Sequence, residues 1–550
     1  MIGHPASLGS DAELVSVRTP RHEQIALAVR FFGEGPVVGV ALQIDEGADD
    51  LRLELPWEES KSVRGCKLKI RINPDRALLA GTHWRLLLFT GLQNETLRAH
   101  TVHVPVKIVV RMMAGNLHCN LDRETIAFPD WSEGRLLHLT CRRRYPSDTM
   151  AFKLKELALY FASLPFAWYW RRRGPVLMYD HESRLVRDNA YYLFTYIMEH
   201  APQHIRKHVF FIVDSSNPYA KQLDSYREQV LPLASSRHLL ALATARGFVA
   251  SQLGLHAYPW NPRPSVFRHL APRKPLYFLQ HGVTAIKQAH LSRAFCRQSS
   301  EDQVSNIKTF VTTSSREQAL VVNYLGYSVS EAPILGFPRW DVLEDRSKPD
   351  APVILYMPTW RPWLRDVSQT AFCESGYCAS VCALLSDSHL HEVLEAHGAR
   401  LIVYVHPILR HYEDSFGGNL PNCVQLVHND ELFLNDLIMQ CSVLITDYSS
   451  VMWDALYLDK PVLLYQFDQE RFLSPLPGEF SVGSYIDFDT EAPATVCCTV
   501  DECVTALKRC IESGFTLSDR HQQLAEPWFA FRDHDNCERI YAHLLESGWL

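Results

Sequence analysis

The strongest chemical signal in the chain is the segment at residues 445–454, which reads ITDYSSVMWD. A short apolar run at 441–446 is typical of a buried strand, and apolar residues at helical spacing follow from Val451. This order predicts Asp447 at the N-cap of a helix, with Ser449 and Ser450 in its first turn. Two hydroxyls and free backbone N–H groups at a helix start suit a phosphate or diphosphate. An ordinary capped helix after a buried strand is the alternative.

Polar clusters follow three other apolar runs that are typical of buried strands. They are Gln280-His281-Gly282, Pro358-Thr359-Trp360-Arg361, and His406-Pro407 with Arg410 nearby. A histidine at a strand end can act as a general base because its ordinary pKa lies near neutral pH. The Thr359 hydroxyl and the Arg361 guanidinium suit phosphate oxygens. A structural role for each cluster remains the alternative.

From about residue 175 onward, apolar runs of strand length alternate with helical patterns, which indicates parallel α/β architecture. A Pro-, Asp- and Lys-containing seam near 335–350 predicts two doubly wound, Rossmann-like halves at 175–340 and 341–550 with a cleft between them. Ligands in such sheets bind outside the carboxyl ends of the strands. We therefore expect the four polar clusters to belong to one site. Candidate strands lie at 176–179, 209–213, 247–250, 277–279, 309–312, 353–357, 401–405, 443–446 and 462–465.

Residues 1–115 contain short, often alternating apolar runs separated by Gly, Pro, Asp and Asn, which predicts a small all-β sandwich. The runs lie at 24–30, 37–44, 51–55, 66–72, 84–90 and 101–110. We find no catalytic constellation in this domain and expect an accessory role.

Residues 116–174 are expected to be a connector that contains an aromatic stretch at 150–170 between two arginine triplets, 142–144 and 171–173. Aromatic side chains flanked by arginines suit a helix in the headgroup region of an anionic membrane. Arg143, Arg172, Trp168 and Trp170 are the candidate contacts. The alternative is a helix buried at a domain junction.

The composition limits the class of protein. A net charge of -7 gives no overall reason to expect a nucleic-acid partner. The fourteen cysteines show no C-x-x-C pair, so we expect free thiols and no zinc site. No secretory signal and no run of 18 uncharged apolar residues is evident, which favours a cytoplasmic protein.

Taken together, the motifs resemble those of the CDP-glycerol:poly(glycerophosphate) glycerophosphotransferase family, the teichoic acid polymerases and primases with their capsule relatives. The resemblance covers roughly 175–545 and includes Gly336-Phe337-Pro338-Arg339-Trp340-Asp341. It implies a GT-B fold, no cofactor or essential metal, and a CDP-activated polyol as donor. In two places the chain departs from the usual pattern, at Val283–Lys287 after the His-Gly pair and at Trp340, so the identity of the polyol stays open.

The resemblance also implies roles for individual residues. His281 would deprotonate the acceptor hydroxyl, and His406 would be needed for activity. His406, Arg361, Ser449 and Ser450 would stabilise charge on the phosphoryl group and on the leaving CMP. Asp447 would orient its loop or form a hydrogen bond to the donor, and Pro358 and Thr359 would line the nucleotide pocket. Possible supporting residues are Gly282, Lys287, Arg339 and Arg410.

We therefore expect an enzyme that transfers glycerol phosphate, or a related polyol phosphate, to a teichoic-acid-like or capsular polymer or a lipid-linked acceptor. It would work at the inner face of the cytoplasmic membrane. The first alternative is a GT-B glycosyltransferase that uses a sugar nucleotide. The second is a non-catalytic polymer-binding protein.

Overall fold

The structure of the protein is a computed structural model in which two compact units are distinguished. The first comprises residues 1–165, 259–270 and 363–368, and the second comprises 166–258, 271–362 and 369–550. The structure describes residues 11–550 except 33–35, 45–51, 62–65, 74–82, 91–97, 132–134, 184–185, 260–261, 287–294, 298–305, 365–366, 368, 417–419, 428–432 and 474–483.

The first unit is built on a β-sheet whose described strands form one connected hydrogen-bonded path rather than two separate sheets. The path runs β5-β6-β2-β1-β8-β7-β11-β10-β9, with β3 paired to β7 and β4 to β3. Its strands are β1 (Ala12–Arg18), β2 (Ile25–Phe31), β3 (Val37–Ile44), β4 (Arg52–Glu54), β5 (Trp57–Lys61), β6 (Cys66–Ile72), β7 (His83–Thr90), β8 (Arg98–His103), β9 (Cys119–Asn120), β10 (Thr125–Trp131) and β11 (Leu137–Arg143). Its helices are α1 (Val106–Ala114), α2 (Met150–Ser163) and α7 (Val266–Leu270).

Two features of this unit differ from the expectation. Strand β8 ends at His103, and α1 begins after Pro105, where we expected the strand to continue to Val110. Proline has no N–H to donate to a strand ladder, and here it stands at the N-cap of a helix. Strands β9, β10 and β11 lie inside 116–174, the range expected to be a connector, and β11 pairs with β7.

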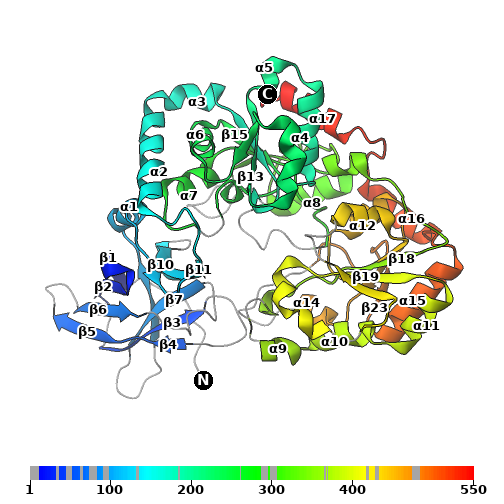
Figure 1. Ribbon diagram of the computed structural model, residues 1–550, viewed down its shortest axis with the longest axis horizontal. Helices are drawn as coiled ribbons and strands as arrows, with labels where there is room; N and C mark the ends of the chain where they lie inside the picture. Colours follow the sequence, from blue (N-terminus) through cyan, green and yellow to red (C-terminus); the bar gives the residue numbers. More distant parts are fainter. Residues whose placement is uncertain are drawn as a thin grey trace. The chain divides into compact units, whose positions relative to one another are not determined.

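The first half of the second unit contains a six-stranded parallel sheet in the order β14-β13-β12-β15-β16-β17 (Figure 1). Its strands are β12 (Val176–Tyr179), β13 (Val209–Val213), β14 (Val230–Pro232), β15 (Gly247–Ala250), β16 (Leu276–Phe278) and β17 (Ile307–Phe310). Its helices are α3 (Ala167–Arg173), α4 (Asn189–His200), α5 (Gln203–Arg206), α6 (Ser236–Thr244) and α8 (Ser315–Leu325).

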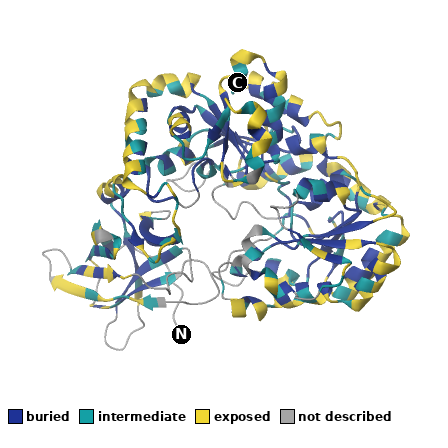
Figure 2. Cartoon of the chain, viewed as in Figure 1, coloured by how far each residue is buried: buried dark blue, intermediate teal, exposed yellow. Residues whose placement is uncertain are grey.

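The second half repeats this design with the strand order β20-β19-β18-β21-β22-β23, again all parallel. Its strands are β18 (Val353–Tyr356), β19 (Arg400–Tyr404), β20 (Val424–Val427), β21 (Val443–Thr446), β22 (Val462–Tyr465) and β23 (Thr495–Cys497). Its helices are α9 (Gln369–Cys373), α10 (Gly376–Leu385), α11 (Ser388–Ala396), α12 (Leu434–Gln440), α13 (Met452–Tyr457), α14 (Gln469–Leu473), α15 (Val500–Glu512), α16 (Asp519–Ala525) and α17 (Asn536–Glu546). Figure 2 draws the central strands of both sheets as buried, and β12, β18, β21 and β22 are buried along their whole length, which fits their continuous apolar sequences.

The predicted fold class is confirmed: two Rossmann-like halves of GT-B type follow an N-terminal β-sheet domain. Strand order reverses beside β12 in the first sheet and beside β18 in the second. Such a reversal opens a crevice at the carboxyl ends of the two strands that flank it. In the second sheet those strands are β18 and β21, which lead into the Thr359 and Asp447 segments.

The last helix crosses back to the first half. Although α17 follows the second sheet in sequence, its buried residues Cys537, Ile540 and Leu544 belong to the hydrophobic core of the first sheet. Figure 1 shows α17, in red, beside α4. The expected range 341–550 is therefore continuous in sequence but contributes to both halves.

Among the described helices, none is both long and apolar enough to cross a lipid bilayer.

Candidate functional site

Asp447 lies at the carboxyl end of β21, but it does not cap a helix. The helix α13 begins at Met452, and its N-cap residue Val451 makes no side-chain capping bond. The buried Asp447 carboxylate instead accepts from Thr359 N at 3.0 and 3.1 Å and from Tyr448 N at 2.6 Å. Because β18 and β21 are neighbours, this carboxylate ties their two carboxyl-terminal segments together. The expectation that Asp447 orients its loop agrees with this geometry, and the predicted helix cap is wrong.

Arg361 is fully buried beneath the same loop. Its Nη1 donates to Asp447 Oδ2 at 2.9 Å, and its Nε and Nη2 donate to Asp468 at 2.7 and 2.9 Å. Burial alone lowers the pKa of Arg361, but Asp447 and Asp468 outweigh burial and raise it. Four aromatic rings lie within 5.1–5.4 Å of the guanidinium carbon, namely those of Tyr377, Tyr448, Phe467 and Phe472.

The environment of Arg361 changes the role expected for it. Its guanidinium is saturated by two carboxylates and a carbonyl and has no exposed surface. In this geometry it cannot contact a donor phosphate, so we revise its role from phosphate ligand to internal support of the Asp447 loop.

Ser449 and Ser450 are half-buried and immediately precede α13. Ser449 Oγ accepts from Val451 N at 3.3 Å in a local turn. The helix is only six residues long, so its dipole is small, and the two hydroxyls are the main polar groups that the loop offers.

The other polar groups of the second sheet lie at the ends of neighbouring strands. Trp360 follows β18 and His406 follows β19, and their ring centroids are 6.3 Å apart. His406 is half-buried, and Arg410 lies in the 3-10 segment Pro407–Phe416 that follows it. Pro358 and Thr359 are buried, and the Thr359 hydroxyl has no hydrogen-bond partner among the described residues.

His281 is exposed at the end of β16, on a loop held by buried polar groups. Gln280 before it has a left-handed φ of 59°. This conformation is fixed by the Gln280 side chain, which donates to Val311 O at 2.5 Å and to Glu317 Oε1 at 3.1 Å. The fully buried Glu317 also accepts from Thr284 N at 2.7 Å. The loop therefore presents His281 on a rigid support.

The structure brings the loops of the two halves together at Gly282. A Cβ on this glycine would lie 2.1 Å from Ser450 Oγ and 2.6 Å from Ser450 Cβ. Any larger side chain would overlap Ser450, so glycine permits the contact between the His281 loop and the Ser449–Ser450 loop. His281, the candidate base, is therefore adjacent in sequence to the residue that contacts Ser450, one of the candidate diphosphate-binding serines.

His256, a neighbour of His281, is uncharged because it is largely buried. Burial, together with the nearby His181 and His281, lowers the pKa of His256 to about 3. His256 therefore stays neutral at neutral pH and adds no positive charge beside His281.

Arg339, expected to be a supporting residue, lies at the linker between the two halves and contacts both of them. Its neighbour Asp341 accepts from the backbone N–H groups of Asn536 and Cys537 at the start of α17. Lys287 lies outside the described residues. Arg143, Arg172 and Trp168 are exposed, and Trp170 is half-buried.

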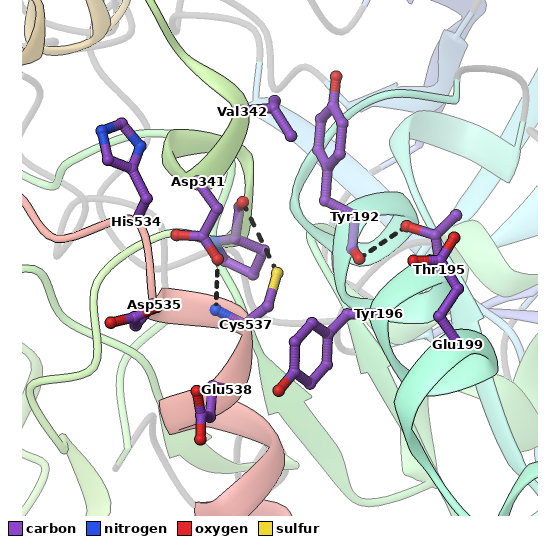
Figure 3. A pocket seen from close by; sticks show the side chains of 11 residues that line it. Tyr192, Thr195, Tyr196, Glu199, Asp341, Val342, His534, Asp535, Cys537 and Glu538 are labelled. Atoms are coloured by element: carbon purple, nitrogen blue, oxygen red, sulfur yellow. Dashed lines mark hydrogen bonds between the residues drawn. The ribbon is translucent and has the colours of Figure 1, made fainter.

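A pocket with a volume of about 200 Å³ lies beside the linker (Figure 3). None of the predicted catalytic or donor-binding residues lines it, and its lining contains four carboxylates but no Lys or Arg. It is therefore a poor candidate for a diphosphate site. Its lining is Tyr192, Thr195, Tyr196, Glu199, Pro338, Asp341, Val342, His534, Asp535, Cys537 and Glu538.

Sequence reasoning missed three carboxylates that hold the site, namely the buried Asp454 and Glu317 and the half-buried Asp468. Nothing in their spacing marks them, because the contacts that matter for the site join each of them to a residue more than 30 positions away. Asp454 falls within the segment 445–454 and could have been suspected there. Among the described residues, no group of three or more His, Cys, Asp or Glu side chains is placed to hold a metal ion.

Comparison with known proteins identifies relatives of this architecture. A family model described as CDP-Glycerol:Poly(glycerophosphate) glycerophosphotransferase matches residues 166–546. The minor teichoic acid biosynthesis protein GgaB of Bacillus subtilis (strain 168) is 25% identical over 68% of this chain and 40% of its own length. A teichoic acid poly(glycerol phosphate) polymerase of the same strain is 23% identical over 63% of this chain and 45% of its own length. The chain thus spans less than half the length of these relatives.

Among solved structures, the wall teichoic acid polymerase TagF aligns over 73% of this chain and 93% of its own, with 13% identity and a TM-score of 0.49.

Proposed function

Because the chain belongs to the CDP-glycerol:poly(glycerophosphate) glycerophosphotransferase family, we propose that it transfers glycerol phosphate, or a related polyol phosphate, from a CDP-activated donor. The acceptor is the hydroxyl end of a polyol-phosphate polymer or of a lipid-linked primer. The single observation that carries this proposal is the contact between Gly282 and Ser450, which joins the His281 loop to the Ser449–Ser450 loop.

In this reaction the acceptor hydroxyl oxygen attacks the phosphorus that carries the polyol. The new P–O bond forms as the bond to the bridging oxygen of the diphosphate breaks, and CMP leaves with that oxygen. His281 takes the proton from the attacking hydroxyl. Ser449, Ser450 and His406 stabilise the negative charge on the phosphoryl oxygens and on CMP.

The buried groups around the site act by positioning. Asp447 and Arg361 hold the β18 and β21 ends, and Glu317 and Gln280 hold the His281 loop. The Thr359 hydroxyl, buried without a partner among the described residues, is a donor-binding group toward the nucleotide. One experiment can identify the polyol and the nucleotide that the protein uses and show whether it requires a metal ion.

The decisive test is CMP release by the purified protein with CDP-glycerol and a glycerol-phosphate-primed lipid acceptor, beside CDP-ribitol and UDP-sugars. We expect acceptor-dependent CMP release that continues in EDTA. The variant His281→Ala should bind CDP-glycerol but lose at least about 100-fold in turnover. Turnover of a UDP-sugar with no CMP release from any CDP-polyol would replace this proposal with a glycosyltransferase.

A second part of the proposal concerns the membrane, and α2 of the first unit supports it. Its buried face carries Lys153 and Glu156, which pair at 3.4 Å, and Glu156 also accepts from Ser265 Oγ at 2.8 Å. Its outward face is apolar, with Met150, Leu154 and Phe161 each between 46% and 59% exposed. Figure 2 shows much of this helix as exposed. A helix that buries charge and exposes apolar side chains is suited to an apolar surface such as the interface of a bilayer.

The helix α3 of the second unit carries exposed aromatic and positively charged side chains of its own. Trp168 is 71% exposed, and the arginines at 171–173 are all exposed in the last turn. Aromatic rings and guanidinium groups together suit the headgroup region of an anionic bilayer. Arg142 is excluded from this role because Asp148 pairs with it at 2.7 Å in a buried position.

We therefore propose peripheral binding to the inner face of the cytoplasmic membrane. Phe161→Glu, Trp168→Glu and the pair Arg143→Glu with Arg172→Glu should each weaken binding to phosphatidylglycerol vesicles at low salt by about tenfold or more. Lys508→Glu, which reverses an exposed charge on α15, is the matched control. Vesicle binding that is unchanged in all three variants would remove the membrane from the proposal.

A further inference from the structure

The linker between the two halves carries one side chain that touches both of them. Arg339 lies in the 3-10 helix η11 (Pro338–Val342) and is only 4% exposed. Its Nε and Nη2 donate to the two oxygens of Asp454 at 2.9 and 3.0 Å. Its Nη1 donates to Asp188 Oδ1 and to the backbone oxygen of His281, both at 3.1 Å. Every nitrogen of the guanidinium is therefore committed.

The partner in the second half is the helix behind the serine loop. Asp454 lies in the first turn of α13, five residues after Ser449, and is 4% exposed. It also accepts from Trp340 Nε1 at 2.6 Å, so two consecutive linker residues hold the same carboxylate. Movement of the linker would move α13 and the loop that precedes it.

The contacts in the first half converge on the backbone of the histidine loop. The backbone N–H of Arg339 donates to Asn189 Oδ1 at 3.1 Å, and Asn189 Nδ2 donates to Gln280 O at 2.8 Å. The side chain of Arg339 holds the next carbonyl, that of His281. Two successive carbonyls of the loop are thus held, directly or through one amide, by a single linker residue.

We propose that Arg339 is a positioning residue that sets the placement of His281 relative to Ser449 and Ser450, so that both halves form one reaction site. This inference rests on the proposed function, because it assigns the two loops to one reaction.

The physical reason for an arginine here is geometric. Only a guanidinium offers a planar fork that binds Asp454 with two parallel bonds while a third nitrogen reaches Asp188 and a carbonyl. A lysine at 339 would keep the positive charge but reach only part of this set. The buried Asp454 and the half-buried Asp188 beside one guanidinium also make its complete removal costly. An error of about 1 Å in the placement of reacting groups can lower a rate by about 100-fold.

The test compares Arg339→Lys with Arg316→Lys in the full chain. Arg316 is the matched control because it also forms an ion pair between the halves, but its partner Glu491, at 2.6 Å, belongs to neither the His281 loop nor the serine loop. Asp454→Asn, which keeps the shape of the side chain, is the second variant in case Arg339→Lys does not fold. For each protein we would measure kcat and KM for CDP-glycerol, the thermal midpoint, and amide hydrogen exchange of the 280–286 and 447–453 segments.

We expect Arg339→Lys and Asp454→Asn to lower kcat by about 10–100-fold while KM changes by less than about threefold. Exchange in both segments should rise by about tenfold or more in these variants but not in Arg316→Lys. Equal kcat in Arg339→Lys and Arg316→Lys, or a lower kcat with unchanged exchange in the two segments, would overturn the positioning role.

The exchange experiment also separates this inference from the proposed function. If the wild-type protein releases no CMP from any donor while exchange rises in Arg339→Lys alone, the proposed function is wrong, but the positioning role of Arg339 is supported. If CMP release is normal in Arg339→Lys and exchange is unchanged, the proposed function is supported, but Arg339 is not a positioning residue.

Discussion

Replacing Arg361 by Met separates a core support from a ligand of the donor phosphate. The side chain is fully buried, and its removal leaves Asp447, whose side chain is 2% exposed, without its cation. Breaking a buried ion pair by removing one partner costs about 3–5 kcal/mol. Since domains are stable by only about 5–15 kcal/mol, this is a large share of the total.

The loss should be visible as a lower thermal midpoint. For a domain of about 150–250 residues, each kcal/mol lowers the midpoint by about 2–4 °C, so we expect a decrease of roughly 6–20 °C. A buried pair is screened little by salt, so the effect should be similar at low and high ionic strength. Urea unfolding followed by tryptophan fluorescence, with Trp360 and Trp453 in the same half, gives the free energy directly.

A double-mutant cycle identifies the partner. Asp447→Asn removes the charge that Arg361→Met would leave unpaired, so the double variant should be less unstable than the two single losses added together. We expect a coupling of about 1–3 kcal/mol. The control is Arg532→Met, which removes a guanidinium that pairs at 2.9 Å with the exposed Asp459 and should cost far less.

The opposite pattern would refute this reasoning. Suppose that Arg361→Met keeps its thermal midpoint within about 1 °C while KM for CDP-glycerol rises tenfold or more. Arg361 would then contact the donor, and its ion pairs with Asp447 and Asp468 would not persist in the donor complex.

Three further predictions follow from particular contacts. Gly282→Ala should lower kcat by about tenfold or more, because its Cβ would overlap Ser450, and a second change, Ser450→Gly, should restore part of the folding stability that the overlap costs. Thr359→Val should stabilise the protein by about 1 kcal/mol, because it removes a buried hydroxyl with no partner among the described residues, and should raise KM for the donor, whereas Thr359→Ser should leave KM near wild type. Burial lowers the pKa of His238 to about 4, and its ring is fixed as the neutral form by Ala234 N at 3.1 Å and Ala257 O at 2.9 Å. As the pH falls from about 6.5 to 4, the unfolded chain binds a proton at this residue that the folded chain does not. The free energy of unfolding should therefore fall by roughly 3 kcal/mol over this range. Urea unfolding of His238→Gln at the same pH values should show a smaller fall. If the free energy of unfolding of His238→Gln falls as steeply with pH as that of the wild type, groups other than His238 cause the acid sensitivity.

The sequence alone determined the two parallel α/β halves and the strand ends that carry the polar groups. Buried parallel strands need continuous apolar runs, and the loops that follow them must carry the polar residues, so both appear in the linear pattern. For this reason the expected strands at 176–179, 209–213, 443–446 and 462–465 coincide with β12, β13, β21 and β22. The strands β9, β10 and β11 were missed because the region 116–174 was interpreted from its arginines and aromatic residues.

Only the tertiary structure decided which polar residues stay accessible and which are enclosed by partners that hold the site together. Arg361 and Ser449 look equally suited to phosphate in the sequence, yet Arg361 is enclosed by Asp447 and Asp468 from distant segments. The bridge from Arg339 to Asp188 and Asp454 likewise joins residues more than one hundred positions apart. Local patterns report whether a residue is polar and where its strand ends. They do not report its partner, because burial and pairing are set by the folding of the whole unit.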